Sequence, residues 1–251
     1  MKTKMKSGKV VGVGVGPGDP DLLTVKAIRV LQDADVVCAP TPNSTGHSIA
    51  LDTIKHVLEG RRSAPEVMTL IFPMTRDEAE LERAWTGNAE RIAKYAHEGR
   101  LVAYVAIGDP SLYSTFTYVQ RELSAKYPEI TVEIIPGVTS LSACVAKGGI
   151  PLASGEETLL IMPRFDLELL KEQSRLVDNI VWMKGIRNIP ETIKLLKDSS
   201  RFSDKSQVLI AKRCCFSDEE LWKGDIHDVL HLKLQEDYFA TMIVRRKPSD
   251  A

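Results

Sequence analysis

Strand-like and helix-like segments alternate through the first half of the chain, and this alternation limits the folds open to it. Short runs rich in apolar and β-branched residues occur five times before residue 137, and an amphipathic stretch follows each of the first four. The run 100–107 is apolar almost throughout, as in a strand buried on both faces. The pattern therefore predicts a mostly parallel α/β sheet. The expected strands are 9–15, 35–40, 66–72, 100–107 and 131–136, and the expected helices are 21–35, 47–60, 76–98 and 112–127.

The second half of the chain changes character. Its strand-like runs are 158–163, 179–184, 207–213, 219–224 and 238–246. Helical spacing separates only the earlier runs, so the last three are expected to pair antiparallel in a mixed sheet. We place a boundary between residues 136 and 137. This gives two α/β domains, 1–136 and 137–251, with the active site expected in the cleft between them.

Charge and hydropathy narrow the function classes. The 251 residues include 33 Lys and Arg and 34 Asp and Glu, for a formal net charge of −1. This balance argues against a general nucleic-acid-binding protein. No apolar run approaches the roughly 20 residues that span a bilayer. The basic N-terminal segment lacks the apolar core of a signal peptide. We expect a cytoplasmic protein with neither nucleic acid nor membrane as a partner.

The cysteines and histidines give little sign of a metal site. The four cysteines contain no C-x-x-C pair, and adjacent Cys214 and Cys215 would form a strained disulfide. Buried free thiols are the favoured interpretation. His227 and His231 stand four residues apart and could bind a metal if they share a helix, so a metal site at this pair stays as an alternative.

Glycines recur at alternate positions in the segment VGVGVGPGDPDLLT, residues 11–24. The dinucleotide fingerprint G-x-G-x-x-G fails, because its third glycine falls on Pro17 or Asp19. The P-loop pattern fails as well, because no lysine is placed to meet a phosphate. The segment predicts a strand-end turn. A purely structural role and a site for a ligand without phosphates both stay open.

A second Gly-Asp-Pro turn, at 108–110, follows the buried strand 100–107, and we expect the next helix to start almost at once. Asp109 is placed to accept a hydrogen bond from a ribose hydroxyl or an ammonium group. It could instead only cap the helix. Two such turns at strand ends, at 18–20 and 108–110, favour a ligand role.

Five segments, in order, resemble the signature segments of the tetrapyrrole (corrin/porphyrin) methyltransferase family. They are VGVGPGDPDLLTVKA (13–27), IGDPSLYST (107–115), IIPGVTSLSA (134–143), WMKG (182–185) and YFATMIVRR (238–246). GDPSLYST followed by FTYV resembles the branch that methylates carbon 20 of precorrin-2 or cobalt-factor II in cobalamin biosynthesis. The run APTPNSTGHS (39–48) departs from the family, because it lacks a lysine that relatives often carry there.

The resemblance implies that S-adenosylmethionine binds in a folded pose between the two domains and gives up its methyl group, with no protein-bound metal. It also implies a homodimer, and it identifies no catalytic base. The positions that match the family's cofactor-binding residues are Pro17, Gly108, Asp109, Leu112, Tyr113, Thr139, Ser140, Met183, Ala211, Thr241 and Met242. Core packing explains Met183 and Ala211 equally well.

A tetrapyrrole substrate carries several carboxylates, and basic side chains at the ends of the C-terminal strands could hold them. The candidates are Lys184, Arg187, Lys212 and Arg213. Each could instead be an ordinary solvated charge. Four further functions stay as alternatives: a cobalt-chelatase type of tetrapyrrole enzyme that uses His227 and His231, methylation of another corrinoid position, methylation of RNA or of an elongation-factor residue, and ligand binding without catalysis. The near-neutral charge disfavours an RNA substrate.

Overall fold

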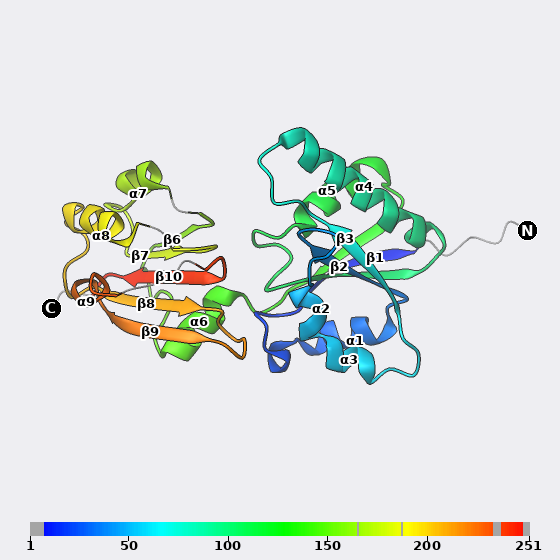
Figure 1. Ribbon diagram of the computed structural model, residues 1–251, viewed down its shortest axis with the longest axis horizontal. Coiled ribbons are helices and arrows are strands. Elements are labelled where there is room, and N and C mark those ends of the chain that lie inside the picture. The colour runs from blue at the N-terminus through cyan, green and yellow to red at the C-terminus, as the bar shows by residue number, and fades with distance from the viewer. Residues whose placement is uncertain (1–7, 165, 187, 233–236, 248–251) are drawn as a thin grey trace, which may run out of the picture. The chain divides into compact units, whose positions relative to one another are not determined.

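The structure is a computed structural model that describes residues 8–164, 166–186, 188–232 and 237–247 (Figure 1). It divides into two compact units, Met1–Thr139 and Ser140–Ala251, each built around one five-stranded sheet. We describe each unit by itself. In the part of the chain that the structure describes, no helix is both long and apolar enough to cross a membrane.

The N-terminal unit contains a parallel sheet in the order β3-β2-β4-β1-β5. All four strand pairings are parallel, which confirms the expected sheet. β1 and β4 are buried at every residue after the first, because both faces of the sheet are covered by helices. The strands are β1 (Lys9–Gly14), β2 (Val36–Thr41), β3 (Glu66–Ile71), β4 (Leu101–Ala106) and β5 (Thr131–Ile135).

Two groups of helices cover the two faces of this sheet (Figure 1). Neighbouring residues of β1 point to opposite faces: Val11 packs with α1–α3 and Val10 packs with α4 and α5. The helix expected over 47–60 is interrupted at Ile54 and forms two short helices. The helices are α1 (Val25–Asp33), α2 (Ile49–Thr53), α3 (Lys55–Glu59), α4 (Glu78–His97) and α5 (Phe116–Lys126), and a short 3-10 turn, η1 (Pro20–Leu22), precedes α1.

The C-terminal unit contains a mixed sheet in the order β6-β7-β10-β8-β9. β6 and β7 are parallel, and the other three pairings are antiparallel, as expected for the late strands. The strands are β6 (Leu159–Met162), β7 (Asn179–Trp182), β8 (Gln207–Lys212), β9 (Glu220–Asp225) and β10 (Ala240–Arg245).

Helices also cover both faces of the C-terminal sheet. On one face Leu170, Ile193 and Ile226 of three helices pack with Ile210 and Met242 of the sheet. These helices are α7 (Leu167–Gln173), α8 (Ile189–Asp198) and α9 (Ile226–Val229). α6 (Ser140–Gly148) packs on β8 and β9 from the other face, where Gly148 lies against the Leu209 side chain.

Candidate functional site

Three adjacent strands bring the signature loops of the N-terminal unit to one edge of its sheet. β4, β1 and β5 are neighbours and run parallel, so the loops that follow them begin side by side. Open α/β sheets bind their ligands at this carboxyl edge. We call the residues 15–24, 107–115 and 136–139 the three-loop edge, and it is the candidate site of this unit.

Glycines let these loops touch backbone to backbone. The N–H of Gly108 donates to the Gly16 carbonyl at 2.7 Å, and the N–H of Gly16 donates back to Gly108 at 3.3 Å. A β-carbon on Gly137 would lie 2.2 Å from the Gly108 carbonyl oxygen, and one on Gly14 would lie 2.5 Å from the Gly137 nitrogen. Close approach between strand ends therefore explains Gly14 and Gly16 without any phosphate, and a β-carbon on Gly12 would instead meet the Phe116 ring at 2.3 Å.

Asp109 joins the loop after β4 to the loop after β5. Its Oδ1 accepts from the Ser111 N–H at 2.7 Å and from the Ser111 hydroxyl at 2.5 Å, and its Oδ2 accepts from the Gly137 N–H at 2.9 Å. The residue is only 8% exposed. Burial alone raises the pKa of the Asp109 carboxyl, but these three hydrogen bonds outweigh burial and hold the pKa below its ordinary value. Asp109 is therefore ionised at neutral pH.

The helix after Asp109 begins later than the sequence predicted, so the helix-cap interpretation of this residue is wrong. Residues 110–115 form turns, and α5 begins at Phe116. Tyr113 has a left-handed φ of 51°, which interrupts a helical path. The Thr115 hydroxyl lies 2.6 Å from the hydroxyl of buried Tyr104 on β4, and this bond anchors the chain just before the helix.

The first loop also forms hydrogen bonds within itself. Asp19 accepts from the Asp21 N–H at 2.9 Å and so caps the short turn η1. Thr24, rather than an aspartate, caps α1 by accepting from the Ala27 N–H at 3.1 Å. Pro17, a predicted cofactor residue, is buried between Gly16 and this turn.

The remaining N-terminal cofactor candidates lie on the other two loops. Gly108 is buried, whereas Leu112 and Thr139 are half-buried and Tyr113 is 42% exposed. An aromatic residue with a positive φ is strained, and strained backbone tends to be kept at functional loops. Half-buried Ser140 begins α6 and so belongs to the C-terminal unit.

The structure brings the four C-terminal cofactor candidates to one end of β7, β10 and β8. Thr241 pairs with Ala211 across β10 and β8, and Met183 follows β7 directly. The side chain of Met242 packs in the hydrophobic core with α7 and α8, so it is not free to meet a ligand. Thr241 precedes Met242 on β10, and its partner Ala211 follows Ile210 on β8. Because side chains alternate along a strand, Thr241 and Ala211 face the side of the sheet opposite to Met242.

Three of the four basic candidates lie at the same strand ends: Lys212 is the last residue of β8, Arg213 follows it and Lys184 follows β7. Arg187 lies outside the described residues. Lys184 and Arg213 both have left-handed backbones, with φ of 59° and 46°. Lys212 is only 9% exposed, and its Nζ lies 3.2 Å from Glu220. Arg213 has a closer partner, because its Nε lies 2.6 Å from an Asp218 carboxylate oxygen.

The histidine pair does not form the helical site that the chelatase alternative required. α9 ends at Val229, so His231 lies beyond the helix that carries His227, and both side chains are exposed. Their ring centroids are 5.6 Å apart. Among the residues that the structure describes, no third histidine, cysteine or carboxylate lies with them at metal-ligand spacing.

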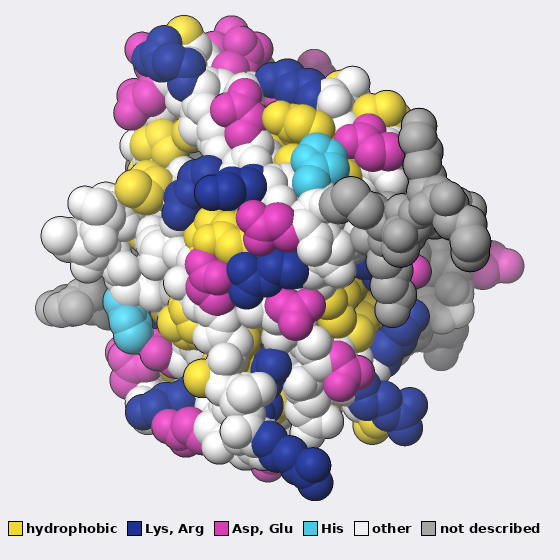
Figure 2. All heavy atoms as spheres, turned by 90° about the vertical axis from the view of Figure 1, so that its right-hand side faces the viewer, with side chains coloured by type: hydrophobic (Ala, Val, Ile, Leu, Met, Phe, Trp, Pro, Cys, Tyr) yellow, Lys and Arg dark blue, Asp and Glu magenta, His cyan; other side chains and the backbone are white. Residues whose placement is uncertain are grey.

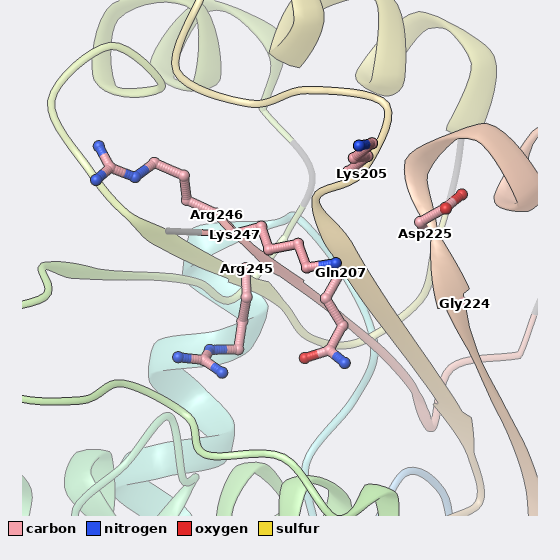
Figure 3. Close-up of a pocket in the computed structure, with 7 residues that line it drawn as sticks. All are labelled: Lys205, Gln207, Gly224, Asp225, Arg245, Arg246 and Lys247. Carbon is pink, nitrogen blue, oxygen red and sulfur yellow. The ribbon is translucent and has the colours of Figure 1, made fainter. Parts of the chain in front are cut away.

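A hollow lies at the end of the C-terminal sheet where β8 starts and β10 ends, away from the cofactor candidates (Figure 3). Its volume is 430 Å³. Two of its cations already have acidic partners: Arg245 lies 2.9 Å from Glu157 and Arg246 lies 3.4 Å from Asp178. The hollow is lined by Lys205, Gln207, Gly224, Asp225, Arg245, Arg246 and Lys247. None of the predicted cofactor or substrate residues belongs to it.

The face drawn in Figure 2 carries charges of both signs. Lys and Arg side chains alternate with Asp and Glu over the face of the molecule in Figure 2. This mixture fits the formal net charge of −1.

Sequence reasoning found Asp109 but missed what holds it. Ser111 stands two residues further on, which is the spacing of an Asx-turn, so a local signal was present. Gly137 is 28 residues away, and only the adjacency of β4, β1 and β5 brings it to the carboxylate. The buried cysteines are free thiols, as expected.

The chain belongs to the tetrapyrrole (corrin/porphyrin) methylases. The sequence profile of that family matches residues 9–230. The family resemblance and the two-sheet α/β fold expected from the sequence are thus confirmed.

Individual relatives agree with this assignment. The chain is 36% identical over 239 residues to a protein of Methanocaldococcus jannaschii named "Probable cobalt-precorrin-2 C(20)-methyltransferase", covering 95% of this chain and 96% of that protein. It is 33% identical to the precorrin-2 C(20)-methyltransferase of a Sinorhizobium species, covering 80% and 83%. The uroporphyrin-III C-methyltransferase of Thermus thermophilus, solved in complex with S-adenosylhomocysteine, superposes with a TM-score of 0.66 at 24% identity, covering 95% and 92%.

Proposed function

We propose that this chain transfers a methyl group from S-adenosylmethionine to carbon 20 of precorrin-2 or of its cobalt-containing form, in cobalamin biosynthesis. The observation that carries the proposal is the buried, ionised Asp109 at the carboxyl edge of the parallel sheet, where it joins two signature loops. The Methanocaldococcus and Sinorhizobium relatives, which match most of the chain, bear names for carbon-20 methylation.

Asp109 acts as a positioning residue in this proposal. Its oxygens already accept three hydrogen bonds from the protein, so it fixes the backbone of Gly108 and Gly137 rather than holding the cofactor by itself. The methionine and ribose parts of S-adenosylmethionine are then proposed to contact the backbone of Gly108 and the residues Leu112, Tyr113 and Thr139. A fixed negative charge near the cofactor also favours its positive sulfonium group.

The chemistry places few demands on the protein. Methyl transfer from a sulfonium to an electron-rich carbon is an in-line displacement by an already activated donor. The protein therefore contributes mainly alignment of the two reactants and exclusion of water. In the C-terminal unit, Met183, Ala211 and Thr241 are proposed to hold the adenine, with Met242 contributing only through its backbone.

Basic residues at the strand ends of the C-terminal unit are proposed to hold substrate carboxylates. Lys212 is the leading candidate, because it is nearly buried and its only described acidic partner, Glu220, is itself exposed. A buried charge with one exposed partner is poorly compensated until an anion binds. Lys184 and Arg213, at the same strand ends as Lys212, are proposed to bind further carboxylates of the substrate.

The decisive experiment supplies methyl-labelled S-adenosylmethionine together with metal-free precorrin-2 or its cobalt form, and identifies the product by mass spectrometry and NMR. One added methyl at carbon 20 supports the proposal and identifies the accepted substrate. A methyl on another carbon would reassign the chain to a different step, and no transfer to either compound refutes the proposal.

The proposed enzyme is a cytoplasmic homodimer, as the family resemblance implies. Sedimentation analysis of the purified chain tests the dimer, and a mass of one chain would contradict it.

Cobalt insertion is tested by incubating the protein with metal-free tetrapyrrole and Co²⁺. Insertion that is lost in His227→Ala would favour the chelatase alternative.

A further inference from the structure

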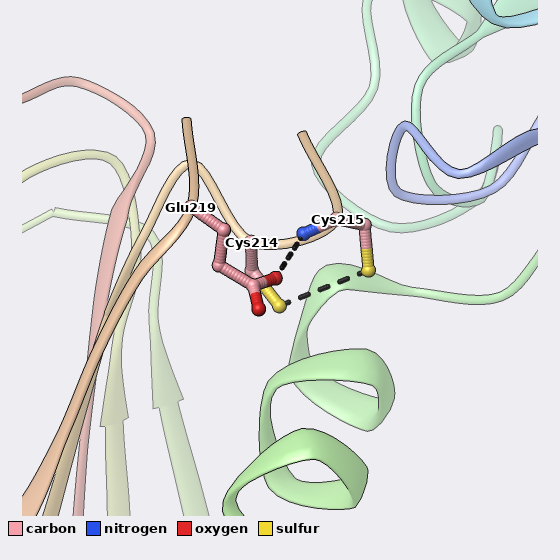
Figure 4. A group of neighbouring side chains, drawn as sticks. All are labelled: Cys214, Cys215 and Glu219. Atoms are coloured by element: carbon pink, nitrogen blue, oxygen red, sulfur yellow. Dashed lines mark hydrogen bonds between the residues drawn. The ribbon is translucent and has the colours of Figure 1, made fainter. Parts of the chain in front are cut away.

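Three cysteines and a glutamate meet in the interior of the C-terminal unit, outside the site described above. Cys214, Cys215 and Glu219 come from the turn between β8 and β9 (Figure 4). Cys144 comes from α6. All three thiols are buried. Sγ of Cys214, Sγ of Cys215 and a carboxylate oxygen of Glu219 lie within 4.8 Å of one another. Over the described ranges, no other set of three potential metal ligands comes this close.

The spacing of the two adjacent thiols fits a tetrahedral metal. The sulfur atoms of Cys214 and Cys215 are 3.8 Å apart. Two thiolates that each stand about 2.3 Å from a tetrahedral Zn²⁺ are separated by about 3.8 Å. Cys144 of α6 interacts electrostatically with Cys214, so a third sulfur lies near the pair.

The backbone of the turn is held in the conformation that makes this spacing. Side chains of consecutive residues in an extended chain point in opposite directions. Cys215 instead has a left-handed φ of 70°, and both thiols can then face the same point. The Glu219 carboxylate accepts from the Cys215 N–H at 2.5 Å, and Lys147 of α6 lies 3.2 Å from that carboxylate. A strained, non-glycine residue fixed in this way is typical of a functional position.

We propose that Cys214, Cys215 and Glu219, completed by Cys144, bind one thiophilic divalent cation of the Zn²⁺ class. Thiolate sulfur with one carboxylate is a donor set that such ions accept. The ion would join α6 to the turn that begins at Arg213, and so would brace one of the proposed carboxylate-binding residues. The ligands show no C-x-x-C spacing, because two are adjacent and Cys144 is 70 residues away, which is why the sequence did not reveal the group.

The test is metal binding by the purified full-length protein, stripped with chelator and kept reduced. Zn²⁺ is titrated against a chromophoric chelator, and Co²⁺ is titrated while thiolate-to-cobalt absorption is followed. We expect one ion per chain, bound at least tenfold more weakly by Cys215→Ala and Glu219→Gln, an effect on the scale of about 10–100-fold reported for perturbed metal sites. Cys38→Ala is the matched control, because Cys38 is an equally buried thiol of the N-terminal unit. It should bind like the wild type.

A second measurement uses the unaltered protein and so does not depend on the variants folding. Zn²⁺ should protect Cys144, Cys214 and Cys215 from alkylation in mild denaturant, as mapped by mass spectrometry, and should leave Cys38 unprotected. The proposal is overturned if the wild type takes up less than one ion per chain at micromolar Zn²⁺. It is equally overturned if Zn²⁺ protects none of the three thiols, or if Cys215→Ala folds and binds as tightly as the wild type.

Discussion

Replacing Asp109 by asparagine tests whether one ionised carboxyl holds the three-loop edge together. The carboxylate accepts three hydrogen bonds, from the N–H and hydroxyl of Ser111 and from the N–H of Gly137. Whichever way an asparagine amide turns, its NH₂ group faces at least one of these donors. The variant therefore loses at least one charge-assisted bond, worth about 1.5–3 kcal/mol, and leaves a donor unsatisfied. We expect the free energy of unfolding to fall by about 2 kcal/mol.

The pH dependence gives this prediction a second readout. Because hydrogen bonding holds the folded pKa of Asp109 below its ordinary value, the ionised carboxyl stabilises the fold at every pH above the unfolded pKa, about 3.9. That contribution is lost as the pH falls through the folded pKa. Urea unfolding of wild type and Asp109→Asn should therefore differ most near pH 7, and the difference should narrow between pH 4 and pH 3.

Asp19→Asn is the matched control, because it alters the same Gly-Asp-Pro sequence in the first loop. Asp19 accepts one exposed hydrogen bond, so its loss should cost no more than about 1 kcal/mol. Calorimetry should show S-adenosylmethionine binding at least tenfold more weakly to Asp109→Asn and nearly normally to Asp19→Asn. The positioning argument fails if Asp109→Asn unfolds within about 0.5 kcal/mol of wild type at pH 7. Unchanged cofactor affinity would remove Asp109 from the cofactor site.

Two further substitutions probe packing and charge. Gly137→Ala should lower the free energy of unfolding by about 1–3 kcal/mol, because the new methyl group meets the Gly108 carbonyl. Gly87→Ala should instead raise the free energy of unfolding by about 0.5–1 kcal/mol, because Gly87 lies within α4 and its new methyl group enters open space. Equal effects of the two in thermal unfolding would refute the close-approach argument. Lys212→Met should leave stability unchanged or higher, because its charge is buried, yet raise KM for the tetrapyrrole about tenfold or more. A Lys212→Met enzyme with normal KM would contradict the carboxylate role, and Glu220→Gln should show no such rise.

The sequence could predict most strands because their signals are local. The run 100–107 is apolar, and its strand β4 is buried on both faces. The order of strands depends instead on contacts between distant residues. β10 enters the C-terminal sheet between β7 and β8, and no pattern within 238–246 distinguishes that place from an edge position. The sequence predicted that this strand pairs antiparallel, but only the structure shows that its partners are β7 and β8.

The same division between local and distant causes explains the errors at the site. Residues 112–115 have side chains compatible with a helix, and the sequence predicted one. The bond between the hydroxyls of Tyr104 and Thr115 delays that helix to Phe116, and it depends on a residue of the preceding strand. Cys144 is likewise brought near Cys214 by the packing of α6 on the C-terminal sheet, which no local pattern in the sequence indicates.

Backbone strain is concentrated at the strand ends that carry the proposed chemistry. Six described residues other than glycine have a left-handed φ. Three of them were already candidates from the sequence: Tyr113 for the cofactor, and Lys184 and Arg213 for substrate carboxylates. A fourth, Cys215, belongs to the thiol group. Glycine would occupy all four conformations with less strain. Their side chains therefore persist at a cost in stability, and strained backbone that persists in this way is a reason to test these four positions first for a functional role.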